Sequence, residues 1–167
     1  MSPDRPVTSA TARIAITGTR TPGLGDEELA DRFDRYLAPF DGPASTWLLG
    51  GAAGIDTLAL QWLTEHGEGD LVVAVPVTTA DQPGEAGAAI RQAGATGRLV
   101  QLLELRHPAG LGPEAFTVRN RWLVEHSEFV VGFPATATAD GSGTWETVNH
   151  ARSLDRPVLV VPVGTRR

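Results

Sequence analysis

The chain has 167 residues and a formal net charge of −6, with 14 basic residues against 20 acidic ones, and it contains no cysteine. Every basic residue is arginine, which excludes chemistry that needs a lysine, such as a Schiff base or a P-loop. The lack of cysteine excludes disulfides and thiolate metal sites, and the acidic balance argues against a broad cationic surface for duplex DNA.

The start of the chain and its hydropathy suggest how the domain is organised. Residues 1–12 are rich in Pro, Ser, Thr and Ala and hold no apolar run, so we expect a flexible tail and no signal peptide. The remaining residues, 13–167, suit a single compact domain. No stretch approaches the roughly 18 consecutive apolar residues of a membrane span, so we expect a soluble, cytoplasmic protein without membrane contact.

Short apolar runs alternate with longer helical patterns along the chain. Several of the runs are continuously apolar, as in strands that are covered on both faces. The predicted strands are 14–17, 47–49, 71–75, 99–103, 129–133 and 157–161. The predicted helices lie around 26–37, 55–66, 84–93, 116–123 and 144–151. This alternation predicts an α/β fold, with a mainly parallel sheet of about six strands flanked by helices in three layers.

Three glycine-bearing segments fall where predicted strands meet helices: 18–20, 50–56 and 140–144. In parallel sheets, ligands bind outside the carboxyl ends of the strands, where backbone amides and helix dipoles favour anions. One such turn is usually only a tight turn, but three at one edge predict a cradle for a phosphate-bearing ligand. The expected ligand-binding residues are Gly18, Thr19, Arg20, Gly50, Gly51, Gly54, Asp56, Arg119, Gly141, Ser142, Gly143 and Thr144.

Arg119 is the most informative single residue of this set. Helical spacing places it beside Phe116, Trp122 and Leu123, on the face that packs against the core, whereas Arg121 points to the polar side. A guanidinium on a buried face must be paired or hydrogen-bonded. It serves either a structural ion pair or a ligand phosphate or carboxylate.

Other candidates have two interpretations each. Arg20 either contacts a phosphate or is a solvated loop residue. Asp56 either interacts favourably with the dipole of the helix that it begins or binds a ribose hydroxyl. Thr144 caps the last helix, contacts a phosphate, or does both. The spacing of Glu146, Asn149 and His150 gives them a common polar helix face, which is more often solvated than catalytic.

Several site types are not supported by the sequence. No G-x-G-x-x-G fingerprint or P-loop occurs, so an ordinary dinucleotide site is not expected. Ser142 lacks the spacing of a nucleophile elbow. The four histidines show no paired ligand spacing, so we expect neither a metal site nor a cofactor.

Four segments together resemble a known superfamily: Gly18-Thr19-Arg20, the run from Gly50 to Asp56, Arg119-Asn120-Arg121, and Gly141-Ser142-Gly143-Thr144. In this order they are similar to the SLOG superfamily, which includes DprA, YpsA-type and LOG proteins. The resemblance covers about 13–163. It implies a Rossmann-like domain that binds nucleotides or nucleotide-derived ligands over the glycine loops, commonly as a homodimer.

Departures from the LOG pattern P-G-G-x-G-T-x-x-E bear on activity. Laid over 139–147, the pattern places Ala139, Asp140 and Thr147 where its Pro, its first Gly and its catalytic Glu stand. Glu146 is one residue away, about 100° around a helix. The Gly-Ser-Gly-Thr-Trp form is more similar to the YpsA-type branch, and DprA-like proteins bind single-stranded DNA with a basic surface that this acidic chain lacks.

Three functional hypotheses follow. The first is a cytoplasmic, homodimeric sensor or binding protein for a nucleotide-type ligand. The second is a phosphoribohydrolase that cleaves the N-glycosidic bond of a nucleoside monophosphate, with Arg119, Arg121 and Glu146 as catalytic candidates. The third is a DprA-like protein that binds single-stranded DNA.

Overall fold

The computed structural model describes residues 12–164 of the chain. Ala12, which the sequence placed in the tail, instead begins the first strand, and the rest of the expected tail lies outside the described residues. The strands are β1 Ala12–Gly18, β2 Ser45–Leu49, β3 Asp70–Val75, β4 Leu99–Glu104, β5 Phe129–Phe133 and β6 Val158–Val160. The α-helices are α1 Asp26–Tyr36, α2 Ile55–His66, α3 Gly84–Ala95, α4 Pro113–Glu125 and α5 Gly143–Ser153, with short 3₁₀ helices at Ala38–Phe40 and Thr79–Asp81.

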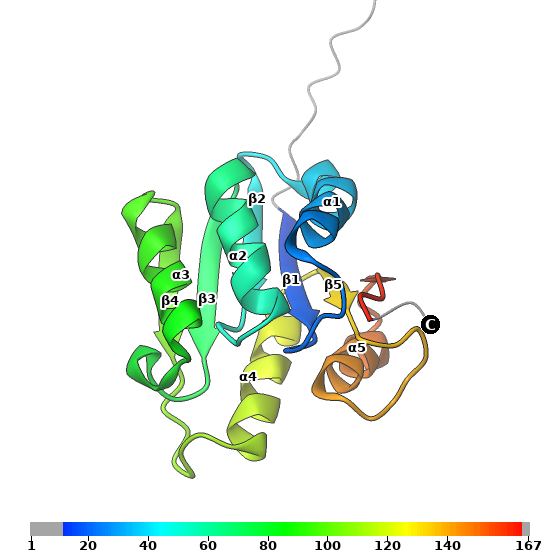
Figure 1. Ribbon diagram of the computed structural model, residues 1–167. Coiled ribbons are helices and arrows are strands. Elements are labelled where there is room, and N and C mark those ends of the chain that lie inside the picture. The colour runs from blue at the N-terminus through cyan, green and yellow to red at the C-terminus, as the bar shows by residue number, and fades with distance from the viewer. Residues whose placement is uncertain (1–11, 165–167) are drawn as a thin grey trace, which may run out of the picture.

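All six strands form one sheet in the order β4-β3-β2-β1-β5-β6, and every pairing is parallel. The predicted three-layer α/β fold is therefore confirmed (Figure 1). The four central strands are buried over most of their length, whereas the edge strands β4 and β6 are not, because a parallel sheet with helices on both faces gives its inner strands no solvated side.

Two hydrophobic cores lie on opposite faces of the sheet. The larger one packs α1, α2 and α3 on one face, around Phe33, Trp47 and Ile90. The smaller one packs α4 and α5 on the other face, around Leu48, Leu123 and Ala151. Among the described residues, no helix is long and apolar enough to cross a membrane.

The strand order places a switch point beside β1. The chain leaves β1 toward β2, β3 and β4, and then returns to pair β5 with the other side of β1. The helices that follow β1 and β5 therefore cover opposite faces, which opens a crevice at the carboxyl ends of these two strands. Ligands of open α/β sheets bind at such crevices.

Candidate functional site

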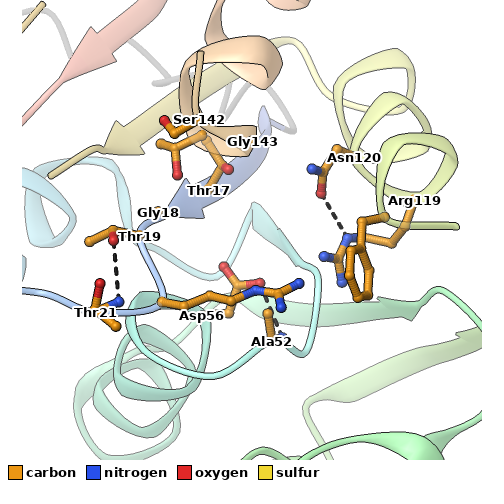
Figure 2. A pocket seen from close by; sticks show the side chains of 13 residues that line it. Thr17, Gly18, Thr19, Thr21, Ala52, Asp56, Arg119, Asn120, Ser142 and Gly143 are labelled. Carbon is orange, nitrogen blue, oxygen red and sulfur yellow. Dashed lines mark hydrogen bonds between the residues drawn. The ribbon is translucent and has the colours of Figure 1, made fainter. Parts of the chain in front are cut away.

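A cavity of about 340 Å³ lies at this switch point. It collects residues from the end of β1, the start of α2, the middle of α4 and the start of α5 (Figure 2). Its lining residues are Thr17, Gly18, Thr19, Arg20, Thr21, Ala52, Asp56, Phe116, Arg119, Asn120, Ser142, Gly143 and Thr144. The structure thus brings the three glycine-bearing segments together at one edge of the sheet.

Close backbone contact joins the first two of these segments. The amide of Ile55 donates to the carbonyl of Thr19 at 3.1 Å. Gly54 has φ +76°, and a Cβ there would lie 2.5 Å from the backbone carbonyl of Arg20. A side chain at Gly18 would collide with that of Ile55. These glycines are needed so that the loops after β1 and β2 can touch, which positions Arg20 at the cavity.

The amino end of α5 closes the other side of the cavity. Ser142 is the N-cap of this helix, since its hydroxyl accepts from the amide of Trp145 at 3.4 Å. The prediction that Thr144 caps the helix is therefore wrong by two positions; Thr144 is buried in the first turn and lines the cavity. Hydrogen bonds from Ser142, and to a smaller extent one from Thr136, hold the pKa of Asp140 below its usual range. The first amides of α5 lack intrahelical partners, which suits an anion.

Arg119 is only 4% exposed. Its Nη1 donates to the carbonyl of Gly50, and its Nε donates to Oδ1 of Asn120 at 2.8 Å. A Cβ at Gly50 would lie 2.7 Å from Nη1, so the glycine makes room for the guanidinium. Burial lowers the pKa of Arg119, but an arginine stays charged in proteins. The side chain is thus fixed by the protein and also faces the cavity.

Asp56 is the carboxylate whose charge acts most strongly on this cation. It is 6% exposed, and its Oδ2 accepts from the amide of Ala52 at 3.2 Å (Figure 2). Burial raises the pKa of Asp56, and the charges of Arg119 and Arg20 oppose that rise. Within residues 12–164, Asp56 and Arg119 do not form a direct ion pair. The cavity therefore holds two cations and one carboxylate.

Arg20 and Phe116 form a stacked pair at the mouth of the cavity. The Cζ atom of Arg20 lies 4.3 Å from the centre of the Phe116 ring. A second hollow, of about 240 Å³, shares four lining residues with the first. They are Arg20, Ala52, Phe116 and Arg119, and the hollow adds Ala53, Asp81, Gln82, Pro83 and Leu111. A flat cation over an aromatic ring offers a surface on which a planar group can stack.

Some predicted site residues do not line the cavity. Gly50 and Gly54 act through the contacts described above, and Gly51 (φ +68°) is buried against the side chain of Val75. Gly141 (φ +77°) is exposed in the loop before α5. Arg121 and Glu146, which lie on the polar sides of their helices, line a different cavity between α4 and α5.

Five lining residues were missed by the sequence reasoning: Thr17, Thr21, Ala52, Phe116 and Asn120. Two of them carried a usable signal. Phe116 precedes Arg119 by one helical turn, and Asn120 stands between the two arginines of the triplet. The others are small side chains whose place depends on how the loops meet.

Comparisons with known proteins identify the family. The model of the DNA recombination-mediator protein A family matches residues 5–167. No curated protein matches the chain. Among solved structures, DNA processing protein A from Helicobacter pylori, described for its single-stranded DNA binding mode, aligns over 94% of this chain and 67% of its own, with 19% identity and a TM-score of 0.64. DNA processing protein A (DprA) from Streptococcus pneumoniae aligns over 90% of this chain and 50% of its own, with 20% identity and a TM-score of 0.66.

These matches distinguish between the branches of the SLOG superfamily, which the sequence motifs alone did not. The assignment to the YpsA-type branch is not supported, because the matching family model is that of DprA. The chain spans half the length of the S. pneumoniae protein and about two thirds of that from H. pylori. The family model covers nearly the whole of this chain, which therefore belongs to the DNA recombination-mediator protein A family.

Proposed function

We propose that the cavity at the carboxyl edge of the sheet binds single-stranded DNA by holding an individual nucleotide of the strand. The observation that carries the proposal is that two features line the same cavity. One is the buried cation of Arg119, and the other is the stack of Arg20 on Phe116, with Cζ of the arginine 4.3 Å from the centre of the ring. The first suits a phosphate and the second suits an unpaired base. The family membership and the single-stranded DNA binding of the H. pylori relative point the same way.

The shape of the site favours a strand over a free nucleotide. The cavities of about 340 and 240 Å³ share four lining residues, so the site is open along the sheet edge toward Pro83 and Leu111. Because the two hollows are joined, successive nucleotides of one strand can occupy them together.

Duplex DNA fits less well. A base can stack on Phe116 only if it has left its own stack, which costs little in a flexible single strand and about 1–2 kcal/mol per base-pair step in a duplex. The net charge of −6 also gives no broad attraction for a polyanion. Binding therefore depends on a few local contacts.

The geometry supports binding better than N-glycosidic hydrolysis. Such hydrolysis needs a carboxyl group beside the scissile bond of the bound nucleotide. Glu146, the acid proposed for this role, lines the cavity between α4 and α5 and not the one that holds Arg119. The carboxyl group that lines the Arg119 cavity is that of Asp56, which accepts from the Ala52 amide and faces the charges of Arg119 and Arg20. The homodimer implied by the resemblance stays a prediction, which sedimentation of the purified chain checks.

Fluorescence anisotropy with a labelled oligothymidylate tests the proposal. The chain should bind the single strand and not a duplex of the same length. If Arg20 and Arg119 neutralise two phosphates, log K should fall with log salt with a slope of about −1.4. Replacing Phe116 with alanine should weaken binding about tenfold, since stacking is worth about 1–3 kcal/mol per base.

Phe40, an exposed phenylalanine beside Phe129 and outside the lining of the cavity, provides the matched control, and Phe40→Ala should leave binding unchanged. Displacement of the oligonucleotide by AMP or ADP-ribose at much lower concentration would instead favour the nucleotide-sensor hypothesis. Equal binding of single strand and duplex would contradict the proposal.

Asp56 gives the binding a predictable pH dependence. Because burial raises its pKa, it takes up a proton at a higher pH than an exposed aspartate when the solution is acidified. Protonation leaves Arg119 and Arg20, the charges that face it, without an opposing carboxylate. Affinity for an oligonucleotide, whose diester charges do not change in this range, should therefore rise as pH falls through the raised pKa.

Asp56→Asn is the matching variant, since the amide keeps an oxygen for the Ala52 amide. It should bind about fivefold more tightly than the wild type at neutral pH, equivalent to about 1 kcal/mol of relieved repulsion. The difference should shrink on acidification, as anisotropy titrations at several pH values would measure. A variant that binds more weakly at every pH would show that the carboxylate helps the ligand.

A further inference from the structure

A third cavity, of about 410 Å³, lies between α4 and α5. All of its lining side chains are polar, and they come in comparable numbers from the two helices. Those that matter for binding are Asn120 and Arg121 of α4 and Glu146, Asn149 and His150 of α5. We refer to this cavity as the α4–α5 groove.

The charges across this groove are held apart. Arg121 and Glu146 are both exposed and stand on facing helices, yet within residues 12–164 neither takes part in an ion pair. Opposite charges on neighbouring helices usually meet when they are within reach. Here the hollow separates them, so the guanidinium of Arg121 remains available to a ligand.

The histidine and asparagine side chains of α5 in this groove differ in what they leave free. Nε2 of His150 is buried and lies 3.6 Å from Oε1 of Glu125, so it faces that carboxylate. Asn149 is exposed on the same helix face. Its carboxamide is therefore the hydrogen-bonding group of this face that a ligand can reach.

Asn120 connects the groove to the cavity that holds Arg119. It lines both. Its Oδ1 is occupied by Nε of Arg119 at 2.8 Å, and its Nδ2 lies toward Gly143, 4.0 Å from the place a Cβ would take there. In Figure 2, Asn120 stands on the same side of the cavity as Arg119, across from the amino end of α5. A chain that leaves the first cavity past Asn120 enters the groove.

We propose that the α4–α5 groove is a further nucleotide subsite, which takes a nucleotide adjacent to the one held at Arg119 and shares no lining residue with the hollow beside Pro83 and Leu111. The inference rests on the proposed function of the first cavity. Arg121 contacts the phosphate that joins the two nucleotides, and the carboxamide of Asn149 hydrogen-bonds to the sugar or base. With no aromatic ring other than the imidazole in its lining, the groove recognises its nucleotide by hydrogen bonds, in contrast to the stacking at Phe116.

A comparison of two ligands isolates this subsite. Thymidine 5′-monophosphate fills only the first cavity, whereas the dinucleotide pTpT reaches both. Competition against labelled oligothymidylate should show that wild-type protein binds pTpT more tightly. Arg121→Ala should weaken the binding of pTpT about tenfold and leave the affinity for the monophosphate unchanged. It should also reduce the salt slope of oligonucleotide binding by the amount that one phosphate contact contributes.

Arg91→Ala is the matched control, because Arg91 is also exposed but lies on α3, in the opposite helical layer. It should change the affinity for neither ligand. Asn149→Leu supplies a second variant that removes a hydrogen-bonding group without changing the charge. It should weaken the binding of pTpT but not that of the monophosphate.

The outcomes separate the two proposals. If wild-type protein binds the monophosphate and pTpT equally well, or if Arg121→Ala weakens both alike, the groove is not a subsite while the function of the first cavity stands. If neither ligand nor the oligonucleotide binds to wild-type protein, both proposals are wrong.

Discussion

Arg119→Ala is expected to remove single-stranded DNA binding almost completely. The guanidinium is 4% exposed and is held by Gly50 and Asn120 before any ligand arrives. A preorganised cation in a buried setting strengthens an anion contact, and truncating one side of such a contact costs about 3 kcal/mol, or roughly a hundredfold in Kd. Anisotropy titration against oligothymidylate measures this loss.

Stability must be followed in the same variant. The carbonyl of Gly50 loses its donor, which costs about 1–3 kcal/mol, and Asp56 loses an opposing charge. Arg119→Lys keeps the positive charge but cannot make both hydrogen bonds from one rigid plane, so it should fold better and still bind weakly. If a folded Arg119→Lys or Arg119→Ala protein binds DNA as tightly as wild type, Arg119 is a structural residue only.

Gly54→Ala is expected to destabilise the protein by about 3–4 kcal/mol, from two causes. Gly54 has φ +76° and ψ −126°, a combination outside the left-handed helical region that costs a residue with a side chain about 1–3 kcal/mol. Its Cβ would also lie 2.5 Å from the backbone carbonyl of Arg20, and a backbone atom cannot rotate away. The loop after β1 must move, and Arg20 moves with it.

Gly97 is the comparison, because it also has a positive φ (+75°) and no atom lies within 4 Å of the place that a Cβ would take. Gly97→Ala should lose only about 1 kcal/mol. Urea unfolding of both variants gives the difference between them, which combines the cost of separating the loops after β1 and β2 with the added backbone strain from the ψ of Gly54. Equal losses would show that these loops do not depend on close contact.

Much of the fold follows from patterns in the sequence. Runs such as 71–75 and 129–133 are apolar on both faces, which only a sheet covered twice can accommodate, so the three layers were predictable. The strand order was not, because no local pattern records that β5 pairs with β1 after α4 crosses the sheet. The cap of α5 was misplaced because Ser142 and Thr144 are both good capping residues and stand only two positions apart.

The site was predictable to the extent that it depends on local geometry. Helical spacing alone placed Arg119 on the buried face of α4, where the structure has it. Arg20, in the loop after β1, and Phe116, on α4, are far apart in the sequence, and only the folded chain brings them together. The overall acidity favoured a small-molecule ligand, but net charge describes the whole surface and not one cavity edge.

Photo-crosslinking with an oligonucleotide that carries 5-iododeoxyuridine tests the central claim most directly, because it reports where a base lies on the folded protein. After digestion, mass spectrometry should find the crosslinked base on the peptide that contains Phe116, and the crosslink should be lost in the Arg119 variants. Crosslinks confined to the outer faces of α1 and α2, for example near Arg35 or Glu65, would contradict the account.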